Sequence, residues 1–447
     1  MKLSVIGTGY LGAVHAAAMA SLGFDVVGVD VDPDRIRSLA GGLAPFYEPD
    51  FDGLLERVAA EGSLTWSTDY DAIADADVHF LCVGTPQQVE SNAADLRFIW
   101  AAVTALLPQL QPGSVIAGKS TVPVGTSAEI EAMVRGEWTR RGLNPDEAPA
   151  VVWNPEFLRE GFAVEDTLQP DRIVVGLPEG ELASAAEARM REVYASQIAA
   201  GIPFLVTDRP TAELVKVAAN AFLATKISFI NAMAEVCEAA GADVLTLADA
   251  IGHDARIGRR FLGAGVGFGG GCLPKDIRAF STRAGELGVD QALTFLREVD
   301  DINSRRRDRA VSSARELVGG SFVGRRVVVL GAAFKPNSDD VRDSPALDIA
   351  ARIHNEGAEV VVHDPKAIEN ARRRFPALTY ERDLAVALAD AELLLLLTEW
   401  DDYRTLDPAA TAAVVADARI LDGRNVLDGD AWRGAGWTLR GMGREHG

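Results

Sequence analysis

The sequence predicts an α/β protein in which two doubly wound, Rossmann-like domains are joined by a helical connector with a long central helix. Short apolar runs alternate with longer helical patterns over the N-terminal part of the chain, and the same alternation begins again near Arg326. Between them, residues 211–240 are rich in Ala and contain neither Gly nor Pro. Alternating strands and helices are typical of parallel sheets covered by helices, whereas the middle segment favours one long helix.

The strands expected in each domain are short apolar runs. In the first domain they are Leu3–Ile6, Val26–Val29, Val78–Val83, Val115–Ala117, Val151–Trp153 and Ile173–Val175. In the second domain they are Arg326–Gly331, Val360–Val362, Leu393–Leu397 and Ile420–Leu421. With 447 residues, the chain has room for two or three domains. We expect a dinucleotide-binding domain at 1–205, a helical dimerisation domain at 206–315 and a second Rossmann-like domain at 316–447.

The composition is that of a soluble globular protein, with 48% hydrophobic and 24% charged residues. Against 44 basic side chains stand 65 acidic ones, and the net charge of −21 opposes general binding to nucleic acid or anionic lipid. We therefore expect neither a nucleic-acid partner nor a membrane partner. An anionic substrate would need locally placed Arg and Lys.

The sequence gives little support to membrane insertion, secretion or metal binding. No apolar run, Leu393–Leu397 included, approaches the length needed to cross a membrane, and the first residues lack the features of a signal peptide. We expect a cytosolic protein. Cys82, Cys237 and Cys272 have no spacing typical of disulfides or metal ligands, and the six histidines are scattered. We therefore expect reduced thiols and no metal.

The first motif is a glycine triplet, Gly7-Thr8-Gly9-Tyr10-Leu11-Gly12, directly after the first expected strand. Its glycines would let the backbone approach a pyrophosphate at a helix N-terminus, and Asp30 can accept hydrogen bonds from both ribose hydroxyls. A merely structural turn is the alternative, but strand, helix and acid occur at the right spacing. We predict NAD as cofactor, because Asp30 would repel the 2′-phosphate of NADP. Because Arg35 lies nearby in the sequence, NADP stays an alternative cofactor.

The second motif is a glycine-rich loop, Gly263–Gly271, that leads into Cys272-Leu273-Pro274-Lys275-Asp276. Six glycines in nine residues allow close wrapping around a ligand, although a flexible connector is the alternative. Pro274 is well placed to open a helix, whose positive end would lower the pKa of the Cys272 thiol. An isolated cysteine is commonly a buried hydrophobe, and Asp276 could be an ordinary first-turn acid. The glycine loop favours a reactive thiolate instead.

Other polar residues could assist such a thiolate. Lys216 and Asn220 are four residues apart on the expected long helix and share one face, where they could stabilise an alkoxide or an oxyanion. An ordinary solvated Lys beside an Asn is the alternative. Glu156, Glu160 and Thr121 follow expected strands. They should therefore lie at the sheet edge where open sheets bind ligands.

In these motifs and their order, the chain resembles the UDP-glucose/GDP-mannose dehydrogenase family over nearly its whole length. The matching motifs are Gly7–Gly12, Tyr47-Glu48-Pro49, Ser120–Pro123, Asn154–Gly161, Lys216 with Asn220, Asn231, Arg256-Ile257-Gly258, the glycine–cysteine loop, Phe334-Lys335, Arg342 with Ser344-Pro345, Thr398-Glu399-Trp400 and Asp422-Gly423-Arg424. So many ordered matches are not expected by chance. Among the family's members, the chain looks most like those that oxidise UDP-glucose.

The resemblance implies roles for individual residues. The implied catalytic residues are Cys272 as nucleophile, Lys216, Asn220 and Asp276 close to it, and Thr121 and Glu156, which would position or activate a water. The implied cofactor-binding residues are Gly7, Gly9, Tyr10, Leu11, Gly12, Asp30, Arg35, Thr85, Thr121, Glu160, Lys275 and Arg342. The implied substrate-binding residues are Glu156, Phe157, Leu158, Lys216, Asn220, Asn231, Arg256, Phe268, Gly269, Phe334, Lys335 and Arg424. In this family one arginine reaches in from a neighbouring subunit, which implies at least a homodimer built on the long helix.

Two positions depart from the family's pattern. Gly271 stands where relatives commonly have Ser, and Gly263 stands where many carry a Lys expected near the substrate phosphate. We hypothesise that Arg259 or Arg260 supplies the missing charge. Replacing the right one with Ala should raise KM for the nucleotide sugar, and no change at either position would refute the idea.

The implied reaction oxidises a primary alcohol twice, to a carboxylate, through a thiohemiacetal and a thioester on Cys272. Which carboxylate is the base in each step stays open. GDP-mannose is an alternative substrate, because Cys272–Asp276 is also typical of the subfamily that oxidises GDP-mannose. Val266–Gly269, however, is closer to the UDP-glucose type. A UDP-N-acetyl sugar is a further alternative. A catalytically inactive nucleotide-binding protein would need no nucleophile. A one-step 2-hydroxy-acid dehydrogenase would leave the second sheet domain without a purpose.

Overall fold

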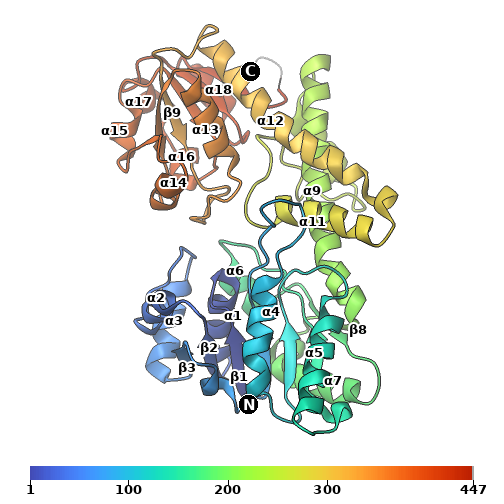
Figure 1. The fold of residues 1–447 in the computed structure, drawn as a ribbon. Coiled ribbons are helices and arrows are strands. Elements are labelled where there is room, and N and C mark those ends of the chain that lie inside the picture. Colours follow the sequence, from blue (N-terminus) through green and yellow to red (C-terminus); the bar gives the residue numbers. More distant parts are fainter. Residues whose placement is uncertain (445–447) are drawn as a thin grey trace. The chain divides into compact units, whose positions relative to one another are not determined.

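The computed structural model describes residues 1–444 (Figure 1). The chain divides into two compact units, the first ending at Ala219 and the second beginning at Asn220. This boundary falls inside the helix α9 (Arg209–Ala240). Each unit contains one sheet with helices, which confirms the α/β class with two Rossmann-like domains and a long central helix. The three-part division at residues 205 and 315 stays a prediction, and its last residues, 445–447, lie outside the described part.

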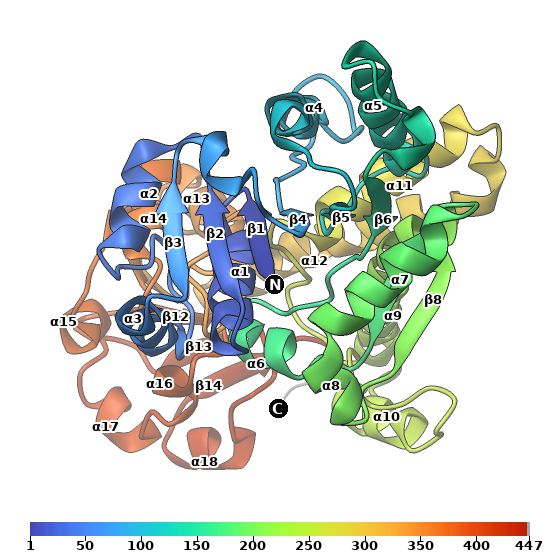
Figure 2. The ribbon, with the colours of Figure 1, turned by 90° about the horizontal axis from the view of Figure 1, so that it is seen from below.

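The first sheet has eight strands in the order β3-β2-β1-β4-β5-β6-β7-β8 (Figure 2). These strands are β1 (Lys2–Ile6), β2 (Asp25–Val29), β3 (Leu64–Ser67), β4 (Val78–Leu81), β5 (Val115–Gly118), β6 (Ala150–Trp153), β7 (Ile173–Leu177) and β8 (Phe204–Asp208). The first sheet is parallel except at one place, where β6 pairs with β7 antiparallel through Trp153 and Gly176. After β6 the chain therefore starts β7 at the end of the sheet where β6 finishes, instead of crossing back to the end where β6 began.

Both faces of the first sheet are buried. Val115 and Val152 belong to one core cluster, whereas the adjacent Ile116 and Val151 belong to the other. Helices α1, α3 and α7 contribute to the first cluster, and α4 and α5 to the second. The helices before α9 are α1 (Tyr10–Ser21), α2 (Pro33–Ala40), α3 (Phe51–Glu61), η1 (Tyr70–Ile73), α4 (Arg97–Leu106), η2 (Leu107–Gln109), α5 (Thr126–Arg140), η3 (Pro145–Glu147), α6 (Ala163–Leu168), α7 (Leu182–Val193) and α8 (Ala195–Ala199).

The second unit contains a parallel sheet in the order β11-β10-β9-β12-β13-β14, which repeats the connectivity of the first six strands of the first sheet. Its strands are β9 (Arg326–Leu330), β10 (Glu359–His363), β11 (Thr379–Tyr380), β12 (Leu393–Leu396), β13 (Arg419–Asp422) and β14 (Thr438–Gly441). Its helices after α9 are α10 (Val244–Gly252), α11 (Leu273–Glu286), η4 (Asp290–Leu293), α12 (Phe295–Leu317), α13 (Pro345–Asn355), α14 (Ile368–Arg374), α15 (Leu384–Leu388), α16 (Asp401–Arg404), α17 (Pro408–Ala412) and α18 (Gly429–Gly434). Helix α12 packs against α13, β12 and β13.

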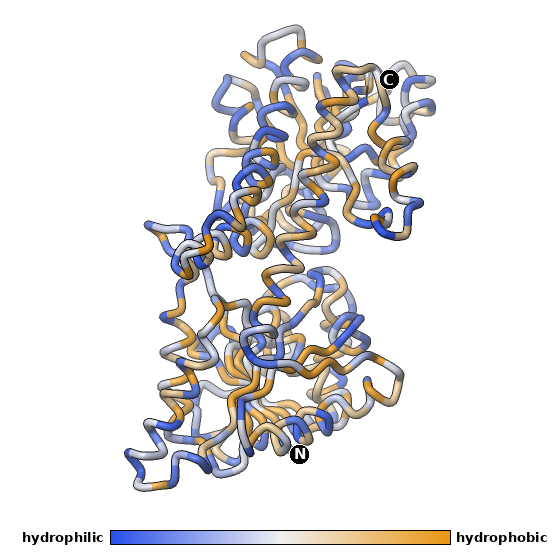
Figure 3. Tube along the Cα trace, turned by 90° about the vertical axis from the view of Figure 1, so that its right-hand side faces the viewer, coloured by the Kyte–Doolittle hydropathy of each residue, from blue (hydrophilic) through white to orange (hydrophobic). Residues whose placement is uncertain are grey.

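Hydrophobic stretches run through both units, as Figure 3 shows. Helix α9 is long and apolar enough to span a membrane when judged by length and composition alone. However, it carries buried polar side chains, and Glu213, Asn220 and Asn231 are each hydrogen-bonded to other groups of the protein. Such bonded polar groups along the helix favour the core helix of a folded protein over a membrane span.

Candidate active site

The glycine triplet forms the turn between β1 and α1. Gly7 adopts a φ of +88°, which favours glycine. A Cβ on Gly12 would lie 2.9 Å from the carbonyl carbon of Gly7 and closer still to its oxygen, so a larger residue cannot fit without a shift of the backbone. A Cβ on Gly9, the N-cap of α1, would meet nothing within 4 Å. The first turn of α1 therefore offers open N–H groups to an anion such as a pyrophosphate.

The carboxylate of Asp30 is held in place just after β2. It accepts hydrogen bonds from the Thr8 N–H at 2.7 Å and the Asp32 N–H at 3.0 Å, and it pairs with Arg35 at 2.9 Å. Burial raises the pKa of Asp30, but these hydrogen bonds and the Arg35 charge outweigh it and hold the pKa below its ordinary value. An ionised acid beside a glycine turn fits the ribose and pyrophosphate of NAD.

Tyr10 takes part in a buried link to Glu48 that the sequence did not reveal. The Tyr10 hydroxyl donates to Glu48, whose carboxylate accepts the N–H of Gly161 at 2.7 Å and that of Ala163 at 2.6 Å. Burial, together with Glu48, raises the pKa of Tyr10 far above its ordinary value. The loop after β6 is thus tied to α1. The sequence signal was the acid in Tyr47-Glu48-Pro49, which indicated a motif but no bonding partner.

The predicted residues Glu156 and Lys216 meet at the carboxyl end of β6. The Lys216 Nζ lies 3.1 Å from Glu156 Oε1, and the other carboxylate oxygen accepts the Leu158 N–H at 2.6 Å. The same ammonium lies 5.5 Å from the centre of the Phe157 ring. Lys216 is buried and Glu156 half-buried, so the Glu156 carboxylate lies beside a cation and an aromatic ring in a partly enclosed position.

Loops after neighbouring strands are also joined. The Thr85 hydroxyl donates to the backbone carbonyl of Thr121 at 2.7 Å, which connects the segments after β4 and β5. Glu160 is half-buried in the loop after β6, and Leu11 packs against the core of the sheet.

Three buried side chains that the sequence did not assign lie beneath these loops. Asn154 accepts hydrogen bonds at Oδ1 from Lys119 at 3.1 Å and from the Tyr194 hydroxyl at 2.5 Å. Because Lys119 precedes Thr121 and Asn154 precedes Glu156, this network fixes the bases of both loops. The signals in the sequence were a lysine at the end of an apolar strand and the motif Asn154–Gly161, neither of which indicated this network.

Cys272 occupies the N-cap position of α11, as the position of Pro274 predicts. It is exposed, whereas Cys82 and Cys237 are buried. Burial raises the pKa of the Cys82 thiol to about 12 and raises that of Cys237 as well, so neither suits a nucleophile. Of the three cysteines, only Cys272 combines solvent access with a helix N-terminus.

Asp276 lies one turn into α11 and joins two other predicted residues. The Asn220 amide donates to Asp276 at 2.7 Å, and the Lys275 ammonium lies 2.7 Å from its other oxygen. Asp276 is only 2% exposed, so its carboxylate lies in this bonded cluster rather than in solvent. The structure thus brings Asn220, Lys275 and Asp276 together.

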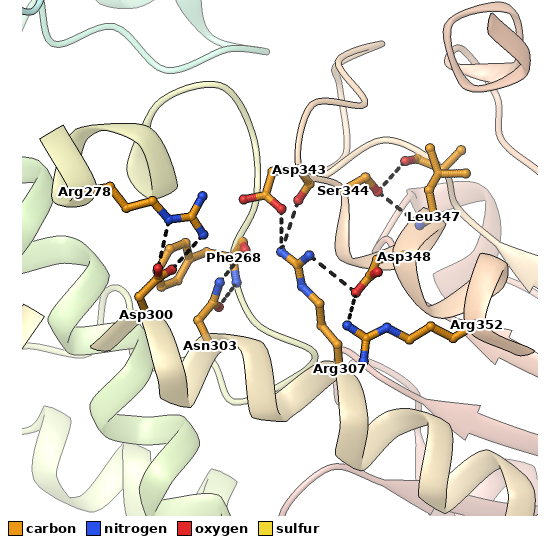
Figure 4. A network of polar contacts seen from close by, with 11 residues as sticks. Phe268, Arg278, Asp300, Asn303, Arg307, Asp343, Ser344, Leu347, Asp348 and Arg352 are labelled. Atoms are coloured by element: carbon orange, nitrogen blue, oxygen red, sulfur yellow. Dashed lines mark hydrogen bonds and ion pairs between the residues drawn. The ribbon is translucent and has the colours of Figure 1, made fainter. Parts of the chain in front are cut away.

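Helix α12 holds the glycine-rich loop through residues that sequence reasoning missed. The Asn303 side chain accepts the Phe268 N–H at 2.7 Å and donates to the Phe268 carbonyl at 2.9 Å (Figure 4). Arg306 donates to the carbonyl of Gly265 at 3.0 Å, while Asn231 accepts the N–H of the same residue at 2.9 Å. Asn231 is fully buried and therefore supports the loop backbone.

Arg424 joins the loop to the second sheet. Its guanidinium donates to the carbonyl oxygens of Leu397 at 2.7 Å, Gly267 at 3.0 Å and Phe334 at 3.3 Å. The Phe334 ring packs against Gly270, and the Lys335 ammonium lies 5.3 Å from the centre of that ring. Phe268, Gly269, Phe334 and Arg424 are therefore gathered around one loop.

Arg256 does not join this group in the single chain. Its guanidinium is exposed and paired with Asp254 at 2.6 Å. Of the two arginines proposed to replace a missing charge, Arg259 is paired with Asp249 and also donates to the Leu262 carbonyl at 3.0 Å. Arg260 is exposed.

Three models of one family match consecutive parts of the chain. The NAD binding domain of the UDP-glucose/GDP-mannose dehydrogenase family matches residues 1–198, its central domain matches 210–305, and its UDP binding domain matches 328–429. The first model covers the glycine triplet and Asp30, the second Lys216 and Cys272, and the third Phe334 and Arg424.

Similar proteins match over nearly their whole length. A UDP-glucose 6-dehydrogenase of Rhizobium meliloti is 40% identical, with 99% of this chain and 100% of the relative covered. The structure of a UDP-glucose dehydrogenase from Pyrobaculum islandicum has a TM-score of 0.85 at 37% identity, covering 96% of this chain and 98% of that one. A UDP-D-ManNAc dehydrogenase from Pyrococcus horikoshii also has a TM-score of 0.85, at 26% identity and with both chains fully covered.

Proposed function

Because the chain belongs to the UDP-glucose/GDP-mannose dehydrogenase family, we propose that it oxidises UDP-glucose to UDP-glucuronate with two molecules of NAD. The observation that carries this proposal is the 40% identity over 99% of the chain to a UDP-glucose 6-dehydrogenase. The UDP-D-ManNAc dehydrogenase matches the fold equally well but at 26% identity, which makes a UDP-N-acetyl sugar the weaker candidate. GDP-mannose stays a further alternative.

The cofactor would be held by the first sheet. The glycine turn and the first turn of α1 would bind the pyrophosphate, and Asp30 the adenosine ribose. Thr85, Thr121 and Glu160 are proposed to line the site around the nicotinamide. When bound, NAD accepts a hydride in each oxidation.

The carbon chemistry needs a covalent anchor because the aldehyde formed in the first oxidation must not escape before the second. In the proposed sequence the C6 hydroxyl loses its proton to a water or carboxylate near Asp276 while the C6 carbon loses a hydride, and Lys216 and Asn220 stabilise the alkoxide. The Cys272 thiolate then adds to the aldehyde carbon and forms a thiohemiacetal. Loss of a second hydride gives a thioester.

Water then cleaves the thioester and releases the carboxylate and the Cys272 thiolate. Glu156 is the proposed base for this water, because it is a carboxylate fixed at the sheet edge beside the Lys216 cation. The overall reaction consumes one water and two NAD and yields two NADH, the uronate and three protons, so electrons and atoms balance. Each lost oxyanion donor should lower the rate by about 10²- to 10³-fold.

The nucleophile is tested by Cys272→Ser. We expect the variant to release uronate at less than a thousandth of the normal rate, because serine at a helix N-terminus lacks the thiolate's nucleophilicity. Near-normal uronate release by a correctly folded Cys272→Ser enzyme would refute the thioester mechanism. Cys237→Ser serves as the matched control, since Cys237 is buried within another helix.

We also propose a homodimer formed through α9. Phe222, Phe229 and Val236 are all exposed on this helix and recur every seven residues, which places them on one face. Ile257 and Phe261, which follow the exposed Arg256 in the chain, are exposed as well. A dimer that covers this apolar face would let Arg256 of one subunit reach the substrate of the other. Phe229→Asp should give a monomer in light scattering with reduced activity, and an unchanged mass would contradict the interface.

The cytosol is the proposed location. The mechanism requires Cys272 as a free thiol, and reducing compartments keep exposed thiols in that state. The proposed division of labour follows the three predicted domains, with NAD bound by 1–205, the dimer formed by 206–315 and the nucleotide of the substrate bound by 316–447.

A further inference from the structure

The segment Asp340–Asp343 lies along the end of the glycine-rich loop. The Gly270 N–H donates to the Arg342 carbonyl at 2.9 Å, and a Cβ on Gly269 would overlap the Asp343 carbonyl. Arg307 of α12 holds the Asp343 carboxylate at 2.9 Å (Figure 4). The two stretches of backbone are therefore fixed against each other just before Cys272.

Gly271 is the residue directly before Cys272, and the space beside it is filled by the Arg342 guanidinium. A Cβ on Gly271 would lie 2.6 Å from Arg342 Nη2 and closer still to two other atoms of the same group. Gly271 is not among the glycines with positive φ, so the backbone itself does not require glycine here. Because the obstructing atoms are the end of a flexible side chain, a larger residue could be accommodated if Arg342 moved.

The charges near Cys272 are mostly paired. Lys275 is bound to Asp276 at 2.7 Å, and Arg307 to Asp343 at 2.9 Å. Arg342 is bound to Asp340 through Nε at 2.9 Å and Nη2 at 2.7 Å. Lys335 lies over the Phe334 ring, which packs against Gly270. Of these groups, the Arg342 guanidinium is the one in contact with the residue that precedes the nucleophile.

We propose that Gly271 is a positioning residue, whose missing side chain lets the Arg342 guanidinium lie beside Cys272 and favour its thiolate. A cation close to a cysteine stabilises the thiolate over the thiol. Any side chain at position 271 pushes this cation away, while the Asp340 carboxylate stays. The inference rests on Cys272 being the nucleophile of the proposed function, but the state of the thiol can be measured without substrate.

The test measures the rate at which iodoacetamide alkylates Cys272 in the enzyme without ligands, by mass spectrometry over a range of pH. We expect Gly271→Ala to slow alkylation at neutral pH by about two- to tenfold, with the midpoint moved up by at most about one pH unit. Gly271→Val should do so more strongly. Gly285→Ala is the matched control, because a Cβ at this position in α11 would meet nothing within 4 Å.

A double variant separates an effect through Arg342 from a direct effect on the loop. Arg342→Ala alone should slow alkylation at least as much as Gly271→Ala, and adding Gly271→Ala to it should change nothing further. Equal slowing by Gly271→Ala in both backgrounds, or no slowing at all, would overturn the proposal. If alkylation follows the expected pattern but the wild-type enzyme does not oxidise UDP-glucose, the proposed function fails while this inference stands.

Discussion

The two sheets share their strand connectivity but treat the same position in different ways. In each sheet, an aspartate follows the strand that comes second along the chain and accepts N–H groups from the turn after the strand that comes first. Asp30 follows β2 and accepts the N–H of Thr8, whereas Asp364 follows β10 and accepts those of Ala332 and Ala333. Asp30 has the half-exposed Arg35 beside it. Asp364 instead accepts the N–H of Ala367 at 2.8 Å and the indole N–H of Trp400 at 3.2 Å.

The two sheets differ in the segment that connects their first strand to the next helix. Tyr10 opens α1 directly after the glycine triplet, so helix N–H groups face the end of β1. After β9 the chain runs through a long loop, and α13 begins only at Pro345. That loop supplies Phe334, Lys335 and Arg342. One topology therefore gives an open helix N-terminus after the first strand of one sheet and a set of side chains after the first strand of the other.

Replacing Asp364 should have the largest effect on stability. Asp364→Ala removes the acceptor of several buried N–H groups, and we expect a loss of about 3 kcal/mol or more. Chemical denaturation checks the stability, and fluorescence titration checks that the folded fraction still binds NAD with normal Kd. A large loss of NAD affinity in folded protein would show that the second sheet also serves the cofactor.

A methyl group added to the glycine turn of the first sheet should weaken NAD binding. Gly12→Ala pushes against the Gly7 carbonyl, and strain of about 1–3 kcal/mol should weaken NAD binding by roughly ten- to a hundredfold. Gly53→Ala is the control, because a Cβ there meets nothing within 4 Å. Normal NAD affinity in Gly12→Ala would place the pyrophosphate elsewhere.

Replacing Asp30 should have a smaller effect, which is a change in the preference for NAD over NADP. Asp30→Asn removes the charge that repels a 2′-phosphate and frees Arg35 to bind one, so we expect about tenfold weaker NAD binding and a gain in NADP use. The ratio of kcat/KM for the two cofactors measures this change. An unaltered ratio would contradict the role of Asp30.

The smallest expected effect is a dependence of the protein's stability on pH in the acid range. Because the folded state holds the pKa of Asp30 below its ordinary value of 3.8, this group stabilises the protein above that pH. Its contribution is lost as the pH falls through the lower folded value. The melting temperature of Asp30→Asn should therefore fall less than that of the wild type between about pH 4 and pH 3. Asp34→Asn, which removes a carboxylate at an exposed position, is the control variant.

Much of this fold could be predicted because its central strands are buried on both faces and read as continuous apolar runs. The four missed strands, β3, β8, β11 and β14, are the edge strands of the two sheets. At one of these edges, β8 exposes Leu205 and Val206 and loses the pattern of a continuous buried run. Strand β11 is only two residues long. The antiparallel direction of β7 has no local signature in the sequence, because it depends on the end of the sheet at which the chain starts the strand.

Candidate site residues could be named from the sequence where a motif carries its own chemistry, as in the glycine triplet and Cys272. Pairs such as Glu156–Lys216 and Asn220–Asp276 lie about 60 residues apart, so their contacts became known only from the fold. Glu48 and Asn154 stood in matching motifs, but their supporting roles could not be assigned from sequence, and Asn303 carried no signal at all. A buried polar residue looks like a surface one until its bonding partners are known.

The central claim is a double oxidation at one cysteine, and the number of NADH molecules released per UDP-glucose consumed tests it most directly. Absorbance measurements would run with GDP-mannose, a UDP-N-acetyl sugar and NADP in parallel. We predict two NADH per UDP-glucose, with little turnover of the other sugars or of NADP. One NADH per UDP-glucose would contradict the thioester mechanism, and no NADH with any sugar would point to a nucleotide-binding protein without turnover.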